Sequence, residues 1–185
     1  MILSNANRIL REIETISQES FLPIVGPHKG RVLVEVIRRI KPKRILEVGT
    51  LVGYSAILMG RELTSEAKLT TIEIDANEAE IARENIRNAR ILPAVDVIVG
   101  DAIKVLPRLN GKFDLVFIDA GKTEYLDYIC LVEDKLQQGS VIVADNAGIF
   151  ADEMKDYLDY VRSSSRYRSR YIPFGDDGLE VTVRM

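Results

Sequence analysis

Two short stretches of this chain bring oxygen-bearing side chains and a lysine into a pattern that could hold a cation. Asp119 and Lys122 follow one apolar run, and Asp145 and Asn146 follow the next. Carboxylate and amide oxygens are hard ligands, which suit Mg²⁺, Ca²⁺ or Mn²⁺ and poorly suit copper or structural zinc. Either pair alone is more often a helix cap or a turn. Together, with Lys122 three residues beyond Asp119, they favour a metal site with positions left for substrate oxygens.

A glycine-containing turn is the second feature that could do chemistry. In the stretch ILEVGTLVGYSAI, Gly49 lets the backbone turn tightly beside a ligand, and Gly53 opens the next helix. A dinucleotide fingerprint has the pattern G-x-G-x-x-G, and Leu51 stands where its second glycine should be. Leu51 therefore disfavours an NAD-dependent oxidoreductase, and the turn suits a nucleoside cofactor without phosphates.

Two further acidic residues end or follow apolar runs and could bind such a cofactor. Glu73 is placed to accept hydrogen bonds from both ribose hydroxyls, and Asp101 is placed to reach an exocyclic adenine amine. Acidic residues after strands are often solvated loop ends or helix caps, and that alternative stays open for each residue alone. Their order along the chain, after the two glycines, favours the cofactor site.

Alternating strands and helices must position these residues. Helix-compatible segments lie between short apolar runs, which indicates a parallel sheet that is covered on both faces. The expected strands are Arg44–Val48, Leu69–Ile74, Val95–Val99, Phe113–Ile118 and Ser140–Ala144, and the helices between them are Tyr54–Glu62, Asn77–Arg90, Ala102–Leu109 and Thr123–Leu136. The pattern predicts a doubly wound α/β fold, in which ligands bind beyond the carboxyl ends of the strands.

Flanking segments complete the expected architecture. Two helices, about Asn5–Gln18 and Lys29–Ile40, precede the first strand, and one more follows the fifth. Tyr167–Ile172 and Leu179–Arg184 then flank Gly-Asp-Asp-Gly and are predicted to form a hairpin. We expect a mostly parallel seven-stranded sheet with an antiparallel C-terminal edge hairpin. We expect one domain over residues 1–185, with the helices of 1–40 covering the cofactor site and an α/β core over 41–185.

Composition excludes several functional classes. The chain has 185 residues, a formal net charge of −3 and 46% hydrophobic residues, which is typical of a globular protein. No apolar stretch approaches the ~20 residues of a membrane span, and the early charges at the N-terminus favour the cytoplasm over secretion. One histidine and one cysteine cannot build a Cys/His zinc site. The mild acidity disfavours nonspecific nucleic-acid binding.

The glycine turn, together with TIEID and VGDA, resembles the class I S-adenosylmethionine-dependent methyltransferases, which have a Rossmann-like fold. The resemblance implies that Glu47 and Gly49 line the methionine end of the cofactor and that Ser55 helps to hold its carboxylate. It implies that Glu73 binds the ribose. The full set of cofactor-binding residues that it implies is Val25, Glu47, Gly49, Ser55, Glu73, Asp101, Ala102 and Asp119.

The stretches FIDAGKTEY and VIVADN resemble the cation-dependent O-methyltransferases of the catechol and caffeoyl-coenzyme A type. The upstream LPIVGPHKG looks like the segment that those enzymes fold over the cofactor, which would place Val25 beside it. By this resemblance, Asp119, Asp145 and Asn146 bind the cation and Lys122 is the catalytic general base. The resemblance also implies a homodimer.

The expected reaction is methyl transfer to a hydroxyl of a small molecule with adjacent oxygens. A free phenol has a pKa near ~10, and coordination to a dication lowers it. The family's substrate-mouth tryptophans are absent: Phe21 and Gly121 stand at two of those positions, and Tyr171 replaces an acidic residue. The alternatives are a tRNA methyltransferase acting on a hydroxylated nucleoside and a catalytically silent cofactor-binding protein.

Two other features have structural interpretations. Cys130 falls within an apolar helical segment and is expected in the core. The basic run from Arg162 to Arg170 is expected to be a solvated edge, with a small RNA-facing patch as its alternative.

Overall fold

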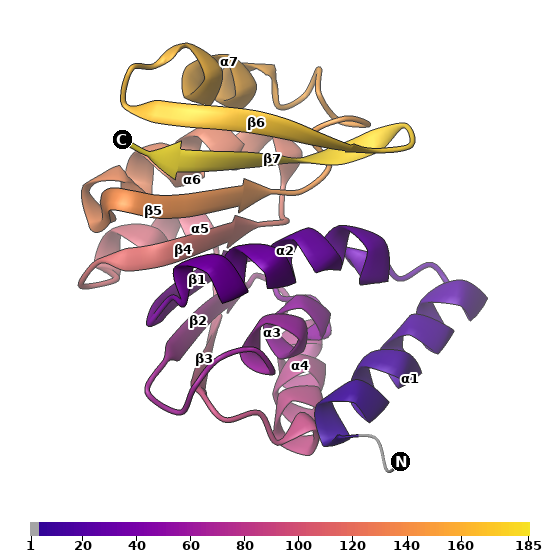
Figure 1. Ribbon diagram of the computed structural model, residues 1–185. Coiled ribbons are helices and arrows are strands. Elements are labelled where there is room, and N and C mark those ends of the chain that lie inside the picture. The colour runs from indigo at the N-terminus through magenta and orange to yellow at the C-terminus, as the bar shows by residue number, and fades with distance from the viewer. Residues whose placement is uncertain (1–3) are drawn as a thin grey trace.

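The computed structural model describes residues 4–185; residues 1–3, at the start of the expected helical region 1–40, lie outside the described residues. Helices and strands alternate along most of the chain (Figure 1). The strands are β1 (Arg44–Val48), β2 (Lys68–Glu73), β3 (Ala94–Val99), β4 (Phe113–Ile118), β5 (Leu136–Ala144), β6 (Tyr167–Phe174) and β7 (Asp177–Arg184). The α-helices are α1 (Asn5–Glu19), α2 (Gly26–Ile40), α3 (Tyr54–Gly60), α4 (Ala76–Ala89), α5 (Ala102–Val105), α6 (Tyr125–Val132) and α7 (Lys155–Ser163).

The seven strands form one sheet in the order β3-β2-β1-β4-β5-β7-β6. Strands β1 to β5 pair in parallel, and β7 pairs antiparallel with both β5 and β6. The predicted doubly wound, mostly parallel sheet with an antiparallel C-terminal hairpin is thus confirmed. The chain reverses its winding direction between β1 and β4, and a ligand site is expected beyond the strand ends there.

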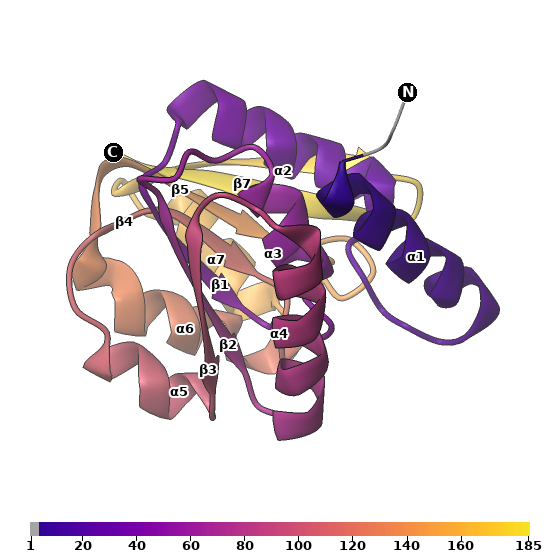
Figure 2. The same cartoon turned by 90° about the horizontal axis from the view of Figure 1, so that it is seen from below.

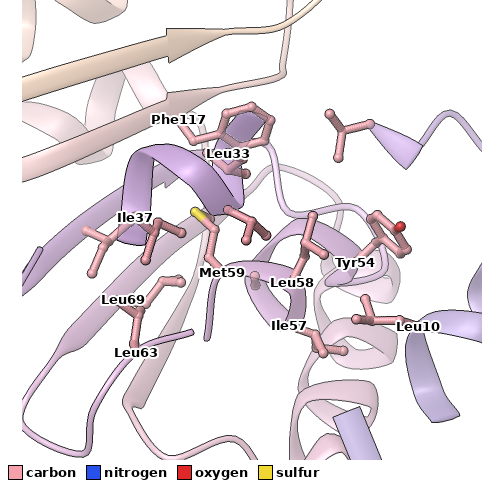
Figure 3. Packing of buried hydrophobic residues seen from close by; sticks show 14 of the residues in the cluster. Leu10, Leu33, Ile37, Tyr54, Ile57, Leu58, Met59, Leu63, Leu69 and Phe117 are labelled. Carbon is pink, nitrogen blue, oxygen red and sulfur yellow. The ribbon is translucent and has the colours of Figure 1, made fainter. Parts of the chain in front are cut away.

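Alternating residues of the central strands face two separate cores. Ile45, Leu115 and Phe117 pack with α1, α2 and α3, whereas Leu46 and Val116 pack with α5, α6 and α7. Figure 2 shows α3 and α4 on one side of the sheet and α5 and α6 on the other. In the first core, Leu33 and Ile37 of α2 lie against Met59 of α3 (Figure 3). Burial on both faces explains why these strands are near-continuously apolar.

Element boundaries differ from the prediction at two prolines and at the junction of α6 and β5, where α6 ends at Val132 rather than Leu136 and β5 begins at Leu136 rather than Ser140. The α-helix that was expected to reach Leu109 ends at Val105 and continues as a 3₁₀ turn over Leu106–Arg108. Pro107 lacks a backbone N–H and its ring crowds the preceding turn, so it stops the α-helix. In contrast, α2 begins at Gly26, earlier than expected, because a proline is tolerated in the first turn of a helix.

Cys130 does not belong to the core, so its predicted burial is wrong. The apolar face of α6 is formed by Tyr125, Tyr128, Ile129 and Val132, which recur at helical spacing. Cys130 follows Ile129 by about 100° of rotation and is exposed.

Within residues 4–185, the structure contains no helix with the length and apolar character of a membrane span.

Candidate active site

A cavity of about 860 Å³ lies at the carboxyl edge of the sheet. Its wall contains all but one of the candidate cofactor-binding, metal-binding and catalytic residues: Val25, Gly49, Ser55, Glu73, Asp101, Ala102, Asp119, Lys122, Asp145 and Asn146. The exception, Glu47, is fully buried and does not line the cavity. The arrowheads of β4 and β5 in Figure 1 point toward the side of the molecule where α2 begins, and Val25, just before α2, joins the wall.

In-register strand ends bring these residues together. Val48 pairs with Ile72 of β2 and with Ile118 of β4, and Ile118 in turn pairs with Ala144 of β5. The next residues extend the ladder, because Asp119 N donates to Val48 O at 2.8 Å and Asp145 N donates to Ile118 O at 2.9 Å. Asp119 and Asp145 therefore lie side by side, each one residue beyond the end of its strand.

The glycine turn packs its backbone against the end of β4. Gly49 has a φ of 96°, which favours glycine, and a Cβ at this position would lie 2.0 Å from the carbonyl oxygen of Asp119. Leu51 also has a positive φ, of 49°, a conformation that costs a leucine free energy. The turn is thus a close-packed, strained segment, and it places the residues that follow β1 directly against those that follow β4.

Backbone amides hold the carboxylate of Glu73. Oε2 accepts hydrogen bonds from Leu51 N at 2.7 Å and Thr50 N at 3.1 Å, and Oε1 accepts one from Asp75 N at 3.0 Å. A carboxylate has about four acceptor positions, so further donors such as ribose hydroxyls can still be accepted. Glu73 therefore orients the glycine turn and remains able to bind a hydroxylated ligand.

Glu47 is the opposite case, a fully buried carboxylate that no backbone amide holds. Neither of its oxygens has a hydrogen-bond partner among the described residues. Burial raises the pKa of Glu47 to about 7, against the opposing influence of the nearby Ser55 and Thr71 hydroxyls. A group with this environment, beneath the cavity and two residues before Gly49, is suited to respond to a cationic ligand. Whether it contacts the methionine end of a cofactor stays a prediction.

Asp101 caps the short helix α5. Its Oδ1 accepts from Ile103 N at 2.9 Å, and its carboxylate forms an ion pair with the exposed Lys104 at 3.1 Å. This is the helix-cap arrangement that the sequence left open as an alternative. Asp101 still lines the cavity beside Ala102, so capping and ligand binding are compatible.

Lys122 is anchored inside the cavity rather than free in solvent. Its Nζ lies 2.9 Å from Asp119 Oδ1 and 3.0 Å from the hydroxyl oxygen of Tyr125, and its side chain is 16% exposed. The Tyr125 hydroxyl donates in turn to the carbonyl oxygens of Ile118 and Asp145. Tyr125 lies in an apolar helical segment of the sequence, which does not indicate this contact, because its ring is in the core while its hydroxyl reaches the site.

Each of the three proposed metal ligands keeps one oxygen free of protein hydrogen bonds within residues 4–185. Lys122 binds Oδ1 of Asp119, which leaves its Oδ2. Lys29 Nζ, at 2.5 Å, and Asn146 N, at 2.7 Å, both donate to Oδ1 of Asp145, which again leaves Oδ2. The side-chain nitrogen of Asn146 donates to Asp177, which leaves the amide oxygen.

These three oxygens are available as ligands for a cation. Burial, followed by the repulsion from Asp119, raises the pKa of Asp145 to about 6, although Lys29 opposes the shift. A dication would remove the repulsion between the two carboxylates. Residues 4–185 contain no cluster of three or more His, Cys, Asp or Glu side chains with metal-binding geometry, so a cation here would depend on the Asn146 amide and on oxygens from outside the chain.

Lys29 and Asp177 are site residues that no sequence motif indicates. Lys29 Nζ bridges Asp145 and Asp177, at 2.5 and 2.8 Å, and all three residues line the cavity. Burial opposes ionisation of Asp177, but the hydrogen bonds from Lys29 and from backbone amides lower its pKa to about 2. The residues are 148 positions apart, so no local pattern could have paired them.

The cavity mouth is apolar. Phe21 is 96% exposed and Ile149 is 61% exposed, and both line the opening. Gly121 lines it too, where a side chain would meet the Glu124 carboxylate at 2.9 Å. Tyr171 is directed elsewhere: its hydroxyl donates to the backbone carbonyl of Asp177 at 2.8 Å and it does not line the cavity.

The chain is similar to known O-methyltransferases. A family model described as O-methyltransferase matches residues 3–162. The chain is similar to catechol O-methyltransferase B of Danio rerio, with 37% identity over 172 residues that cover 86% of this chain and 64% of that protein. It is similar to catechol O-methyltransferase of Mus musculus, with 34% identity over 189 residues that cover 95% of this chain and 71% of that protein. The chain therefore spans less than two thirds of the first relative.

Among solved structures, the chain is similar to the cofactor-bound Rv0187 from MTB. The TM-score is 0.87 with 30% sequence identity, and the match covers 96% of this chain and 89% of that one. The likeness extends over both the α/β core and the N-terminal helices.

Proposed function

This chain belongs to the O-methyltransferase family, and from that premise we propose that it transfers a methyl group from S-adenosylmethionine to a hydroxyl of a small molecule, with the help of a divalent cation. The observation that carries the proposal is the meeting, in one cavity, of the glycine turn and Glu73 with Asp119, Lys122 and Asn146. A substrate with adjacent oxygens, such as an aromatic vicinal diol, suits this site because two of its oxygens and a water could complete the shell of one cation.

The half of the cavity beside β1 to β3 would bind the cofactor. S-adenosylmethionine would supply an electrophilic methyl group on a positively charged sulfur. Glu73 would accept the ribose hydroxyls while it keeps the backbone amides of the glycine turn in place. Asp101 and Ala102 would lie beside the adenine, and Gly49 and Ser55 would lie along the methionine. Val25 would cover the cofactor from the N-terminal side.

The half of the cavity beside β4 and β5 would hold the cation and the substrate. Asp119, Asp145 and Asn146 would each offer the oxygen that the protein leaves free. A bound dication would lower the pKa of a coordinated hydroxyl and fix its direction. The anchored carboxylates would thereby orient the substrate oxygen for in-line attack.

Lys122 would accept the proton of the attacking hydroxyl at Nζ as a neutral amine, a form that a bound dication and the sulfonium would favour by like-charge repulsion. Its contacts with Asp119 Oδ1 and the Tyr125 hydroxyl restrict the position of the amine within the cavity. A general base must lie within hydrogen-bond reach of the proton that it removes, and a fixed amine beside a metal ligand meets that requirement. The apolar mouth at Phe21 and Ile149 would exclude water from the reacting atoms and contact an aromatic substrate.

A methyl-transfer assay tests the proposal directly. The purified chain, with isotope-labelled S-adenosylmethionine, is given catechols, caffeoyl thioesters or bulk tRNA, with Mg²⁺ or with a chelator. We expect label on a small aromatic diol in the presence of Mg²⁺ and loss of that transfer with the chelator. Transfer to tRNA alone would contradict the proposed substrate class. Transfer that persists in the chelator would contradict the cation.

A further inference from the structure

We propose that Asp177 is a positioning residue for the cation site, because it fixes the side-chain amide of Asn146 so that the amide oxygen is available to the metal. The inference rests on the proposed function, since it concerns the same cation. Asp177 lies at the start of β7, 31 residues after Asn146, and the fold brings the two side chains together.

The orientation of the Asn146 amide follows from hydrogen-bond chemistry. Its Nδ2 lies 2.8 Å from Asp177 Oδ2. An ionised carboxylate can accept hydrogen bonds but cannot donate them, so the atom that faces it must be the NH₂ group. The reversed amide would place two oxygens against each other. Asp177 therefore directs the amide oxygen of Asn146 away from itself.

Asp177 is itself held firmly. Lys29 Nζ donates to its Oδ2 at 2.8 Å, and the backbone amides of Gly148 and Ile149 lie 3.4 and 3.2 Å from its Oδ1. The Tyr171 hydroxyl donates to its backbone carbonyl at 2.8 Å. These contacts come from α2, from the loop after β5 and from β6, so the carboxylate has little freedom to turn away from Asn146.

Lys29 extends the same arrangement to the second ligand. It donates to Oδ1 of Asp145 at 2.5 Å, as does the backbone N of Asn146 at 2.7 Å. One side chain from α2 thus contacts both Asp145, a proposed ligand, and Asp177, the residue that orients the next ligand. Hydrogen-bonded outer groups of this kind set the direction of metal ligands in proteins.

A structural role alone is the competing explanation, because Asp177 also ties the β6–β7 turn to the loop after β5. The two explanations differ in what happens when Asn146 no longer needs orientation. An aspartate at position 146 presents two equivalent oxygens, so its affinity for a cation does not depend on Asp177 for direction.

Binding of Mn²⁺ alone to the full-length protein, followed by the paramagnetic resonance signal of the free ion, tests the inference. We expect Asp177→Ala to bind Mn²⁺ roughly 10–100-fold more weakly than the wild type. Asp177→Asn keeps the volume but can present either amide atom to Asn146, and we expect a smaller loss, of about threefold or more. Asp176→Ala is the matched control, because this exposed neighbour lies in the same turn, and we expect unchanged affinity.

The decisive comparison uses the Asn146→Asp background. There, Asp177→Ala should leave Mn²⁺ affinity unchanged or raise it, because it also removes a repulsive carboxylate. An equal loss in both backgrounds, or no loss in either, would overturn the positioning role. Calorimetric binding of S-adenosylmethionine verifies that each variant is folded. If the wild type itself does not bind Mn²⁺, both the proposed cation and this inference fail, whereas wild-type binding that is insensitive to Asp177 overturns this inference alone.

Discussion

The two halves of the cavity are built in different ways. Beside β1 to β3, backbone amides from the adjacent turns hold the acidic side chains, as Glu73 and Asp101 illustrate. Beside β4 and β5, the acidic side chains are held largely by lysines, and one of these, Lys29, comes from a helix 116 residues away along the chain. The first half therefore relies on backbone amides, and the second relies on side-chain ion pairs, one of which spans 116 residues.

This difference indicates how each half should respond to change. A carboxylate that is bound by backbone amides keeps its surroundings when distant side chains are altered. A carboxylate that is held by a lysine loses its partner with a single substitution, and an uncompensated buried charge is costly. Variants in the β4–β5 half should therefore alter cation binding and turnover, while variants in the β1–β3 half should alter cofactor binding and stability.

The largest expected effect is on turnover in the β4–β5 half. Lys122→Ala should lower kcat by roughly 10²–10⁴-fold, as is typical when a general base is lost, while Mn²⁺ and cofactor binding persist. Steady-state methyl transfer measures the rate. Lys122→Arg separates the roles: it keeps the positive charge beside Asp119 but cannot readily accept a proton, so it should stay inactive. Recovery of activity in Lys122→Arg would show that only the charge matters. The control is Lys155→Ala, an exposed lysine of α7, and we expect it to turn over at the wild-type rate.

The next largest effect is on the pH dependence of stability. It comes from Glu47, the carboxylate in the β1–β3 half that backbone amides do not hold. The pKa of Glu47, about 7, lies above the ordinary 4.5, so the folded state binds more protons than the unfolded state between these values. The free energy of unfolding must then fall as pH rises through this window, by up to about 3 kcal/mol. Glu47→Gln should remove the part of this fall that Glu47 contributes and leave the part that comes from Asp145, whose pKa is raised to about 6. Denaturant unfolding of the cofactor-free protein at pH 5 and pH 8.5 measures it.

The exposed Glu35→Gln on α2 is the matched control for Glu47 and should unfold like the wild type at both pH values. If Glu47→Gln and the wild type lose the same stability between pH 5 and pH 8.5, then Glu47 is not the buried, unpartnered carboxylate described above.

A cation should stabilise the fold through the β4–β5 half alone. Mg²⁺ at 100 times its Kd should add about 2.7 kcal/mol to the free energy of unfolding, and Tm should rise with metal concentration. Asp145→Asn should abolish this rise and leave S-adenosylmethionine affinity nearly unchanged. A metal titration followed by thermal unfolding gives the answer, with Asp96→Asn on the exposed side of β3 as control. If Asp145→Asn weakens S-adenosylmethionine binding as strongly as it weakens metal binding, the two halves of the cavity do not act separately.

The smallest expected effect is on cofactor affinity at Glu73, whose carboxylate is held by backbone amides. Glu73→Ala should weaken S-adenosylmethionine binding by about 2 kcal/mol, roughly thirtyfold in Kd, through loss of charge-assisted hydrogen bonds. The metal-dependent rise in Tm should persist. Calorimetry compares the variant with Glu80→Ala, an exposed residue of α4. Unchanged affinity in folded Glu73→Ala would exclude Glu73 from the cofactor site.

The sequence predicted the mostly parallel sheet, its antiparallel C-terminal hairpin and the acidic residues at the strand ends. Apolar β-branched runs alternate with helical segments, and this pattern leads to parallel pairing that places Glu73, Asp119 and Asp145 at one edge. Errors occurred where a single residue overrides a pattern. Pro107 shortens α5, and the rotation of α6 exposes Cys130.

The sequence by itself determined the chemical types at the site, because Glu73 ends a strand, Asp119 and Asp145 each follow one directly, and the sheet fixes where strands end. Only the tertiary structure decided how their side chains are oriented. Lys29 and Asp177 meet across 148 residues, and the Tyr125 hydroxyl reaches Lys122 from a ring in the core. Local patterns report backbone geometry over a few residues, whereas a contact of this kind exists only after α2, β5 and the β6–β7 hairpin have packed together.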